Sequence, residues 1–482
     1  MRPPRAIPYG PAPWPTKRSS PGADQDGWGV NGSMEGARAP VPTPVDGRLV
    51  ELLAVLAATA MAAWPFTGDD LLAGMLAVPA LVLHAAVLFQ PRPSLAGRVA
   101  SLVILVTALA VMPGLYQAVN FAHEPTMQHG QDGGVAVTNL AVRALLDGRD
   151  PYTQSYAELL DDMPIYFGDG LIDNPIMERY PYWPATLLVQ LPVQAPLLAA
   201  GVSVVDPRYV YLGVLLALGV GLARFSLRVR GDLLLAVAVA LNPLLLTWTR
   251  WGTNDVLAVS ALALMAWALG RRRTVLAGLA LGLALACKLL VAPAVVLFVA
   301  WLARRARDRQ LDRPTAVRAA AAAVLPVAVT AVPFLLWHPA AFLDDALLYH
   351  LGLSAERFPI AGHGLPALLY AFGVIGDPMG PTPVWASTLP TLLVLAVGAG
   401  WLWRRATTSP QAFLLAATCV TVGSLWFSRN FMHNYWPVPM TLLAFAVLAP
   451  WPAATPPDGP SSAAQRRSPA RRATLARVAG PR

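Results

Sequence analysis

The sequence predicts an all-α, polytopic integral membrane protein. Apolar residues make up 56% of the 482 residues and charged residues only 13%, whereas a soluble globular protein carries about 25% charged residues. Several apolar stretches also approach or exceed roughly 18 residues, the length that marks a candidate membrane helix. These observations exclude an ordinary cytosolic enzyme and a disordered chain.

Two tails of different composition flank the apolar part. Residues 1–45 contain ten prolines and no apolar periodicity, and residues 451–482 are rich in proline, serine, alanine and arginine. Both compositions predict disordered tails. Between them we expect an N-terminal helix pair at 46–97 and a membrane module at 98–450, with long outer loops at 120–182 and 338–383.

Ten apolar segments predict full crossings, and two further stretches are ambiguous. The ten are 49–66, 71–90, 98–119, 208–226, 232–249, 254–270, 316–337, 384–403, 411–428 and 432–450. Prolines interrupt the stretch 183–205, and the stretch 274–303 is flanked by arginines at both ends. Arginine and lysine are enriched in cytoplasmic loops. If 183–205 does not cross and 274–303 forms a hairpin, every arginine cluster falls on the side of the two termini.

The hairpin predicted at 274–303 has short arms. An arm of about 14 residues rises only about 21 Å, which is less than the roughly 30 Å hydrocarbon core. We therefore expect a re-entrant pair whose tip, at Lys288, is buried in protein or in a wet cavity. The prediction is about 10 full crossings plus this hairpin, or 10–12 transmembrane helices, with both termini cytoplasmic.

The first outer loop, 120–182, predicts a helix of its own. The loop holds ten of the 27 acidic residues and only three basic ones. Apolar residues within it recur at helical spacing, which predicts an amphipathic helix along the membrane surface. The apolar side would hold Val137, Leu140, Ala141, Ala144 and Leu145, and the polar side Thr138, Asn139, Arg143 and Asp147.

The charge and cysteine patterns exclude other kinds of site. The net charge is +9, but no basic stripe alternates with aromatic residues, so we expect no nucleic-acid partner. Cys287 and Cys419 lie in apolar runs and offer neither a disulfide framework nor metal-ligand spacing. No metal site or cofactor requirement can be read from the sequence, and the need for a divalent cation stays open.

Several short motifs resemble, in order, those of the GT-C glycosyltransferases, which use polyprenyl-phosphate sugars. The most similar branch is the bacterial glycosyltransferase family 87, and the resemblance spans roughly residues 98–450. The motifs are His129-Gly-Gln-Asp132, Leu146-Asp-Gly-Arg-Asp-Pro-Tyr152, Tyr180-Pro-Tyr182-Trp-Pro184, Trp251-Gly-Thr-Asn254-Asp255, the segment from Ala277 to Lys288, Trp337-His-Pro-Ala-Ala-Phe342, and Phe427-Ser-Arg429-Asn430-Phe-Met-His433-Asn434-Tyr435.

The resemblance implies a GT-C-like fold and a hexosyltransferase, such as a mannosyltransferase, of the cell envelope. The donor would be a polyprenyl-phosphate sugar, and the acceptor a glycan, a lipid or a protein at the outer face of the bacterial plasma membrane. In the superfamily an aspartate of the first outer loop acts as the base, which points to Asp132. Asp132 could also cap the helix that follows it, and Glu124 is the nearest rival base.

Lys288 stands among leucines and alanines, and it has a physical argument of its own. A lysine at mid-helix in lipid costs about 2.5–3.5 kcal/mol on insertion scales, so it needs an anion or water. A donor phosphate would supply the anion, and the alternative is a structural ion pair, for example with Asp255. Asn254 and Asp255 begin a helix, so they could cap it, face the same cavity, or both.

A second group of donor-phosphate candidates lies at an outer helix boundary. Arg429, His433 and Asn434 fit a phosphate by their charge and hydrogen-bond donors, although His433 could also belong to an aromatic belt. Tyr180 and Tyr182 are supporting residues, in a motif that reads Tyr-Pro-Tyr-Trp-Pro where the superfamily usually has Tyr-x-Tyr-Pro-Pro.

A transporter or flippase of a lipid-linked sugar would share the broken helices and the intramembrane cation. Such proteins often show two related halves, and the sequence shows no such repeat. A non-catalytic relative of the GT-C enzymes is a third alternative. In each case the partners are membrane lipids and a lipid-linked sugar.

Overall fold

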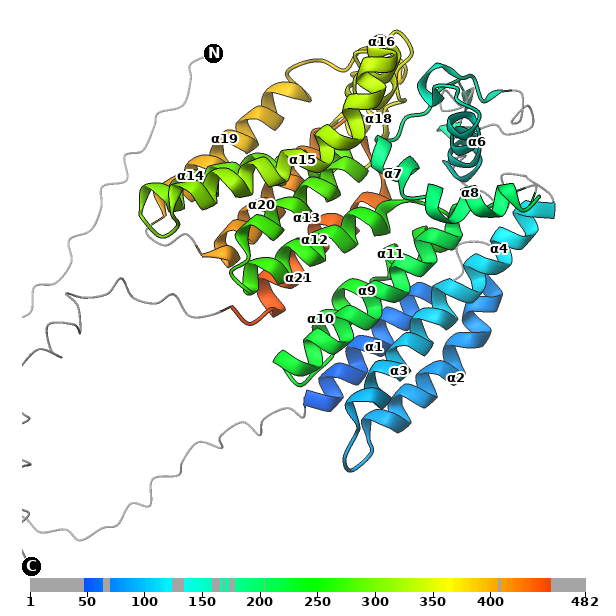
Figure 1. Cartoon of the computed structure of the whole chain (residues 1–482), viewed down its shortest axis with the longest axis vertical. Coiled ribbons are helices and arrows are strands. Elements are labelled where there is room, and N and C mark those ends of the chain that lie inside the picture. The colour runs from blue at the N-terminus through cyan, green and yellow to red at the C-terminus, as the bar shows by residue number, and fades with distance from the viewer. Residues whose placement is uncertain are drawn as a thin grey trace, which may run out of the picture. The chain divides into compact units, whose positions relative to one another are not determined.

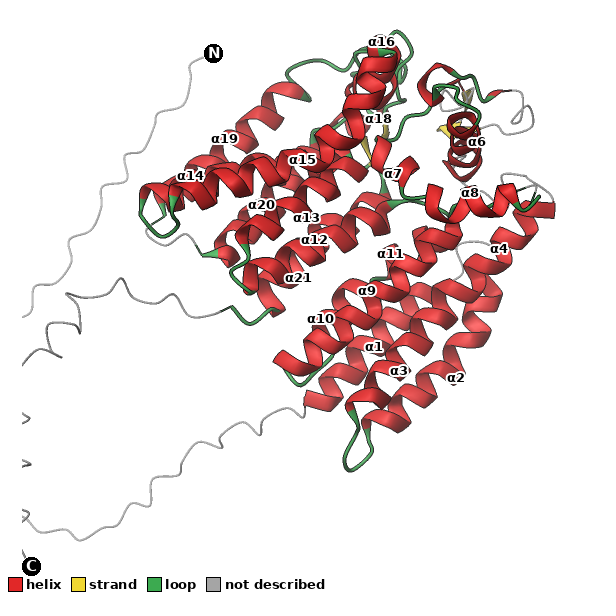
Figure 2. Ribbon diagram, viewed as in Figure 1, coloured by secondary structure: helices red, strands yellow, loops and turns green. Residues whose placement is uncertain are grey.

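The computed structural model describes residues 47–63, 70–123, 134–157, 165–167, 170–172, 178–202, 204–405 and 409–451. The chain divides into two units, 1–45 and 46–482, and all described residues belong to the second. The tail predicted at 1–45, and the one at 451–482 apart from Trp451, lie outside the described residues. Within them the protein is a helical membrane bundle with two short strand pairs (Figure 2), as the sequence predicts.

The first half of the bundle is a layer of helices that lie side by side (Figure 1). Helices α3 and α4 are joined by a π-helical turn at Thr107–Val111, so Leu95–His123 is one apolar helix of 29 residues. The members are α1 (Gly47–Ala63), α2 (Asp70–Leu88), α3 (Leu95–Val106), α4 (Met112–His123), α9 (Arg208–Val229), α10 (Leu234–Ala240) and α11 (Pro243–Arg250).

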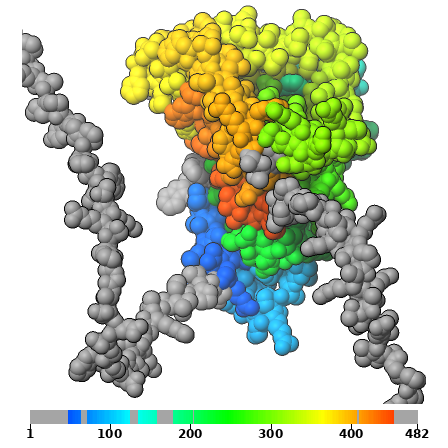
Figure 3. Space-filling model, turned by 90° about the vertical axis from the view of Figure 1, so that its left-hand side faces the viewer, coloured from blue at the N-terminus to red at the C-terminus, as the bar shows by residue number. Residues whose placement is uncertain are grey.

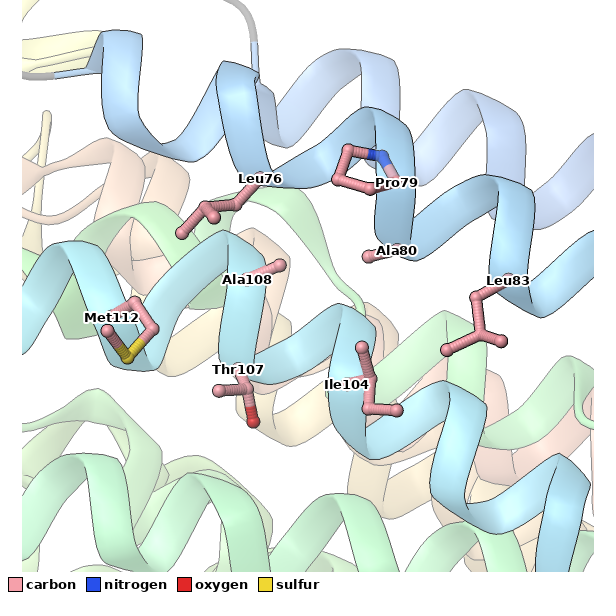
Figure 4. Close-up of a pocket in the computed structure, with 8 residues that line it drawn as sticks. All are labelled: Leu76, Pro79, Ala80, Leu83, Ile104, Thr107, Ala108 and Met112. Carbon is pink, nitrogen blue, oxygen red and sulfur yellow. The ribbon is translucent and has the colours of Figure 1, made fainter.

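A shallow apolar pocket lies between α2 and the π-helical turn (Figure 4). Its volume is about 300 Å³, and its lining has no charged side chain. The one hydroxyl in the lining, that of Thr107, donates to the carbonyl of Val103 at 2.8 Å. The pocket therefore offers packing space but no chemistry.

The second half of the bundle contains the helices that form the larger cavity described below. They are α12 (Asp255–Gly270), α13 (Thr274–Cys287), α14 (Ala292–Arg307), α15 (Arg313–Trp337), α19 (Thr388–Arg404), α20 (Pro410–Trp426) and α21 (Pro437–Leu448). Figure 3 shows that α19, in orange, lies on the surface of this half. Its outer side chains are apolar and exposed, among them Leu389, Leu393 and Val397, as expected of a helix that faces lipid.

Glycines allow α13 and α15 to approach each other closely. A Cβ atom at Gly278 would lie 2.1 Å from the carbonyl oxygen of Ala319, and one at Gly282 would lie 2.3 Å from that of Ala323. Small residues four apart on a membrane helix commonly permit such backbone contact. This packing fixes the position of the end of α13, where Lys288 follows.

Short elements connect these helices. On the first outer loop they are α6 (Gly134–Leu146), the 3-10 turn η2 (Pro151–Thr153), and the antiparallel strands β1 (Ile165–Phe167) and β2 (Gly170–Ile172). The second outer loop contains α16 (Pro339–Leu343), the π-helical turn η6 (Asp344–Leu348), α17 (Tyr349–Leu351), β3 (Ala361–Gly362) and α18 (Leu365–Ala371). Strand β3 pairs in parallel with β4 (Asn430–Phe431), which precedes the 3-10 turn η7 (His433–Tyr435).

The helix boundaries agree with most of the predicted segments. Residues 183–205 form only α7 (Pro184–Leu188) and α8 (Leu191–Ala199), and the stretch 274–303 breaks at Lys288 before the 3-10 turn η5 (Leu289–Val291). In the part of the chain that the structure describes, five helices are long and apolar enough to cross a membrane: Leu71–Leu88, Leu95–His123, Arg208–Val229, Leu289–Arg307 and Arg313–Trp337. The number of crossings, including whether the hairpin is re-entrant, stays a prediction.

The apolar segment predicted at 232–249 is present as Leu234–Arg250. The structure has two helices there, because Pro243 has no amide hydrogen to continue α10. The side chain of Asn242 instead caps the second helix, accepting from the amides of Leu244 and Leu245 at 3.0 and 3.3 Å.

The helix predicted in the first outer loop is present as α6, but its surroundings differ from the prediction. Thr138 and Asn139, which we assigned to a polar face at the membrane surface, are both buried. Asn139 donates to the carbonyl of Val205 at 2.6 Å, so the first part of the polar side faces protein, whereas Asp147 just after the helix is exposed. The helix packs against α7 and α8 as part of a second apolar core, together with Tyr152 and Tyr180.

Candidate active site

A cavity of about 1010 Å³ lies where several helices of the second half begin or end. Helix α12 begins there and α13 ends there, and the segment between α20 and α21 closes one side. The outer loops contribute the remaining wall. The lining residues fall mainly within 181–183, 253–254, 287–296, 347–351, 358–362 and 424–435.

Lys288 supplies the charge of this cavity. Among the described residues that line it, Lys288 is the only lysine, arginine, aspartate or glutamate. The chain is extended at Lys288, with φ −151° and ψ 121°, because α13 ends at the preceding residue. Its ammonium donates to one carboxylate oxygen of Asp255 and lies 5.2 Å from the centre of the Tyr435 ring. The ammonium is thus paired and at the same time reaches the cavity.

The second oxygen of Asp255 accepts from the side-chain amide of Asn434 at 2.9 Å. Asp255 is the first residue of α12, where the helix dipole favours a negative charge. Asn254 precedes it, lines the cavity, and makes no capping hydrogen bond with its side chain. Three predicted site residues, Lys288, Asp255 and Asn434, are therefore joined directly, and a fourth lies beside them.

His433 lines the same cavity from η7. Its Nε2 atom lies 2.9 Å from Nε2 of His363, and its ring stacks on Trp248 with 6.4 Å between centroids. Partial burial, together with His363, lowers the pKa of His433. His350, which also lines the cavity, donates from Nε2 to the carbonyl of Pro181 at 2.7 Å, and burial lowers its pKa.

The structure does not bring Arg429 into this cavity, although the sequence placed it among the phosphate contacts. Its guanidinium donates to the carbonyls of Phe358, Pro378 and Gly380 and to the hydroxyl of Thr382. Burial lowers its pKa to about 10. These contacts fasten the second outer loop onto the end of α20, so a role in positioning that loop fits Arg429 better than a phosphate contact.

The two tyrosines predicted as supporting residues occupy different depths. Tyr182 lines the cavity, whereas Tyr180 is fully buried beneath it. Tyr180 packs edge-on against Tyr182 and Tyr152, with centroid distances of 5.6 and 5.5 Å. The hydroxyl of Tyr152 donates to the carbonyl of Tyr182 at 2.9 Å, so the motif forms part of the cavity wall and its support.

Two predicted residues cannot be placed. Asp132 and Glu124 fall within 124–133, outside the described residues, and α6 begins directly afterwards at Gly134. Their roles as base and rival base stay predictions.

An ion cluster beside the cavity escaped the sequence analysis. Arg179 contacts Asp344, Asp345 and Glu356 at 3.1, 3.5 and 2.8 Å, and Asp345 also accepts from the amide of Tyr180 at 3.1 Å. Burial raises the pKa of Asp345 to about 7. The cluster ties residues just before the wall segment 181–183 to the second outer loop. A signal was present, since Arg179 is one of three basic residues in an acidic loop, but its partners lie more than 160 positions away.

A second such tie joins the same two loops. Asp150 accepts from the amide of Tyr152 at 3.0 Å and from Nδ1 of His338 at 2.7 Å. Both residues belong to motifs quoted above, which shows that these motifs hold the outer loops together.

The model of glycosyltransferase family 87 matches residues 180–428, just over half of the chain. The chain belongs to glycosyltransferase family 87. The matched stretch begins at Tyr180 and includes the cavity wall up to Ser428, with Asn254, Asp255 and Lys288. Residues 430–435 and the first outer loop before Tyr180 lie beyond it. No curated protein and no solved structure matches the chain.

Membership of family 87 identifies the protein as a glycosyltransferase, and the helical bundle identifies it as a membrane protein. Within the described residues, no group of three or more histidine, cysteine, aspartate or glutamate side chains could hold a metal ion.

Proposed function

We propose that the protein is a GT-C-type enzyme that transfers a hexose, such as mannose, from a polyprenyl-phosphate donor. The acceptor is an envelope glycan, lipid or protein at the outer face of the bacterial plasma membrane, with both termini of the chain cytoplasmic. The observation that carries the proposal is the cavity, which combines one charged end with a long apolar wall.

The polar end suits a sugar phosphate. Lys288, Asn254, Asn434 and His433 meet there, and ammonium, amide and imidazole groups are suitable donors to phosphate oxygens. Aromatic rings of Tyr182 and others line the adjoining wall, where an apolar face of a sugar would pack.

The apolar end suits a prenyl chain. Side chains of α14, α19 and α20 line it, including Val296, Leu395 and Leu425. Val296 is also 50% exposed. An accessible apolar wall of this kind suits the tail of a membrane donor.

The reaction we propose is a single displacement. The acceptor hydroxyl attacks the anomeric carbon, its proton passes to the Asp132 carboxylate, and the bond from that carbon to the phosphate oxygen breaks. The phosphodiester carries one negative charge, and the leaving polyprenyl phosphate gains a second. A fixed cation such as Lys288 therefore stabilises the transition state more than the ground state, and the anomeric configuration inverts.

The test uses the purified protein in liposomes with polyprenyl-phosphate mannose, with the corresponding glucose and galactose lipids, and with envelope extracts as acceptors. We expect transfer of one hexose, detected by mass spectrometry, and loss of transfer in Lys288→Met. Arg318→Met is the matched control, because Arg318 is exposed on α15 and bonds only to Thr315.

Adding Mg²⁺ or EDTA in parallel determines whether a divalent cation is needed. Movement of intact donor lipid across the bilayer without transfer of its sugar would instead identify a flippase. Absence of both activities with every donor would overturn the proposed function.

A further inference from the structure

A histidine pair at the rim of the cavity joins two segments that are far apart in the sequence. Strand β3 pairs with β4, and the amide of His363 donates to the carbonyl of Phe431 at 3.0 Å. Gly362 has φ +87°, and a Cβ atom there would lie 2.1 Å from the same carbonyl oxygen. The close crossing requires this glycine, and it fixes the imidazoles of His363 and His433 with their centroids 4.2 Å apart.

The contact between the two rings restricts their protonation. Nε2 of His363 and Nε2 of His433 are 2.9 Å apart, so one must carry a hydrogen and the other must offer a lone pair. The pair then accepts one further proton, which converts it to a single cation, whereas a second would place two positive charges in contact. Such groups titrate as a pair rather than as two separate rings.

Partial burial and the neighbouring His363 lower the pKa of His433, so a proton on this pair is held towards the acidic end of the pH range and needs a stabilising neighbour. His433 stacks on Trp248, and an indole face attracts a cation. Both rings are exposed, so they exchange protons with water. Around them lie Phe431, in edge contact with His363, and Asn434. The charged groups of the adjoining elements are Lys288, paired with Asp255, and Arg429, which is bound to carbonyls.

We propose that His363 and His433 form one proton-sharing pair that supplies the cavity with a second, pH-dependent cation beside Lys288. His433 contacts the donor phosphate, and His363 is a positioning residue that acts through it. The inference rests on the proposed function. As the bond from the anomeric carbon to oxygen breaks, Nδ1 of His433 gives its proton to the leaving phosphate, the proton between the two Nε2 atoms stays in the pair, and the pair becomes neutral. The acceptor's proton goes to the separate base.

The decisive measurement is the affinity for polyprenyl-phosphate mannose, without acceptor, between pH 5.5 and 8.5. A phosphodiester keeps one negative charge over this range, unlike a phosphate monoester, whose second pKa is about 6. Any slope therefore reports the protein. We expect the wild type to bind roughly tenfold more tightly at the acidic end, the worth of one charge-assisted contact.

Two variants isolate the pair. His433→Gln should lose the slope and match the affinity of the wild type at pH 8.5, whereas His363→Gln should shift the midpoint of the slope, because His433 then titrates alone. Lys288→Met should bind weakly at every pH and keep the slope. His123→Gln is the control, because His123 is exposed and its hydrogen bond among the described residues is to Val119 of its own helix. Histidine-selective ¹⁵N NMR should show the two rings titrating together in the wild type, with either substitution uncoupling the other ring.

A slope in His363→Gln with the same midpoint as in the wild type, or two rings that titrate independently in the wild type, would overturn the pair. Equal losses of affinity at all pH values, accompanied by a lower melting temperature, would reduce His363 to a structural residue. If the wild type binds no polyprenyl-phosphate sugar at any pH, the proposed function itself fails, whereas normal binding and transfer without a slope refutes only the inference.

Discussion

The two halves of the bundle bury charge in different ways. Before residue 251, the guanidinium of Arg208 contacts Asp206 through three hydrogen bonds of 2.6–3.1 Å, and both side chains are fully buried. Arg98 likewise meets Glu51 at 2.5 Å. In the second half, Lys288 also has an acidic partner, but its side chain stays 13% exposed and lines a cavity.

The difference shows that a buried charge in a membrane helix does not by itself mark a functional site. In the first half, the ion pairs Arg208–Asp206 and Arg98–Glu51 lie within the packing of the bundle. Arg429 behaves in the same way although it lies close to the cavity, because carbonyls occupy its donors. Access to a cavity, rather than burial, separates the candidates for chemistry from the structural charges.

The largest loss of transfer activity is expected for a substitution in the first outer loop. Asp132→Asn keeps the size of the side chain and most of its capping ability but removes the base. Transfer should fall by about 10²–10⁴, the usual worth of general base catalysis, in a single-turnover assay with saturating donor. Retained transfer in Asp132→Asn with loss in Glu124→Gln would assign the base to Glu124.

Lys288→Met tests the cavity half of the comparison. Because this change strands Asp255, we expect a loss of about 3–5 kcal/mol of stability together with weak donor binding. The double variant Lys288→Met/Asp255→Asn should recover most of its melting temperature in detergent, while its affinity for polyprenyl phosphate stays low. A double variant that binds the lipid phosphate normally would show that the ion pair is purely structural.

Arg208→Met tests the other half with the same design. The single variant should lose a similar amount of stability, about 3–5 kcal/mol, because Asp206 is left buried without its partner. The double variant Arg208→Met/Asp206→Asn should recover it. Here the protein that remains folded should bind donor as the wild type does, and a specific loss of donor affinity would break the distinction between the two halves.

A smaller effect is expected from Asp345 in the ion cluster. Its pKa is raised to about 7 by burial, so between pH 4 and 7 the folded state binds more protons than the unfolded state. Stability contributed by this group therefore falls as pH rises through 7. Relative to Asp345→Asn, the wild type should melt roughly 2–4 °C lower at pH 8, by a smaller amount at pH 5, and equally below about pH 4. A difference of the opposite sign would contradict the assignment.

The last prediction concerns topology rather than stability. It tests on which side of the membrane two exposed positions lie. In a background with Cys287→Ala and Cys419→Ala, Asp147→Cys should react in intact cells with an impermeant thiol reagent, whereas Arg272→Cys should not. Both positions are exposed, so access depends only on the side of the membrane. Labelling of Arg272→Cys from outside would overturn the proposed orientation.

Much of the fold could be predicted because membrane helices are specified locally. The apolar runs predicted nearly every long helix. The prolines at 184, 192 and 196 predicted that the segment 183–205 is broken. The predictions failed where a polar group meets a distant partner. The sequence placed Asn139 on a solvated face, but its side-chain amide donates a hydrogen bond to the carbonyl of Val205.

At the candidate site, too, the sequence predicted the local features and the structure supplied the distant partners. Composition alone singled out Lys288, because a lysine among leucines needs a partner. The sequence could not choose between a phosphate and Asp255, 33 positions away, and the structure shows that the pair with Asp255 forms while the ammonium still reaches the cavity. The partners of Arg179 and His363 could not be predicted from the sequence, because those partners come from other loops.

The sequence by itself determined that this protein is a helical membrane protein, and its motifs indicated the glycosyltransferase family. Those properties depend on local composition and short-range spacing, which a single chain displays directly. Only the tertiary structure decided which charged side chains have protein partners and which face the cavity. The hydrogen-bond partners of Arg429, Asp255 and His433 come from helices and loops that are distant in the chain, so the packing sets them.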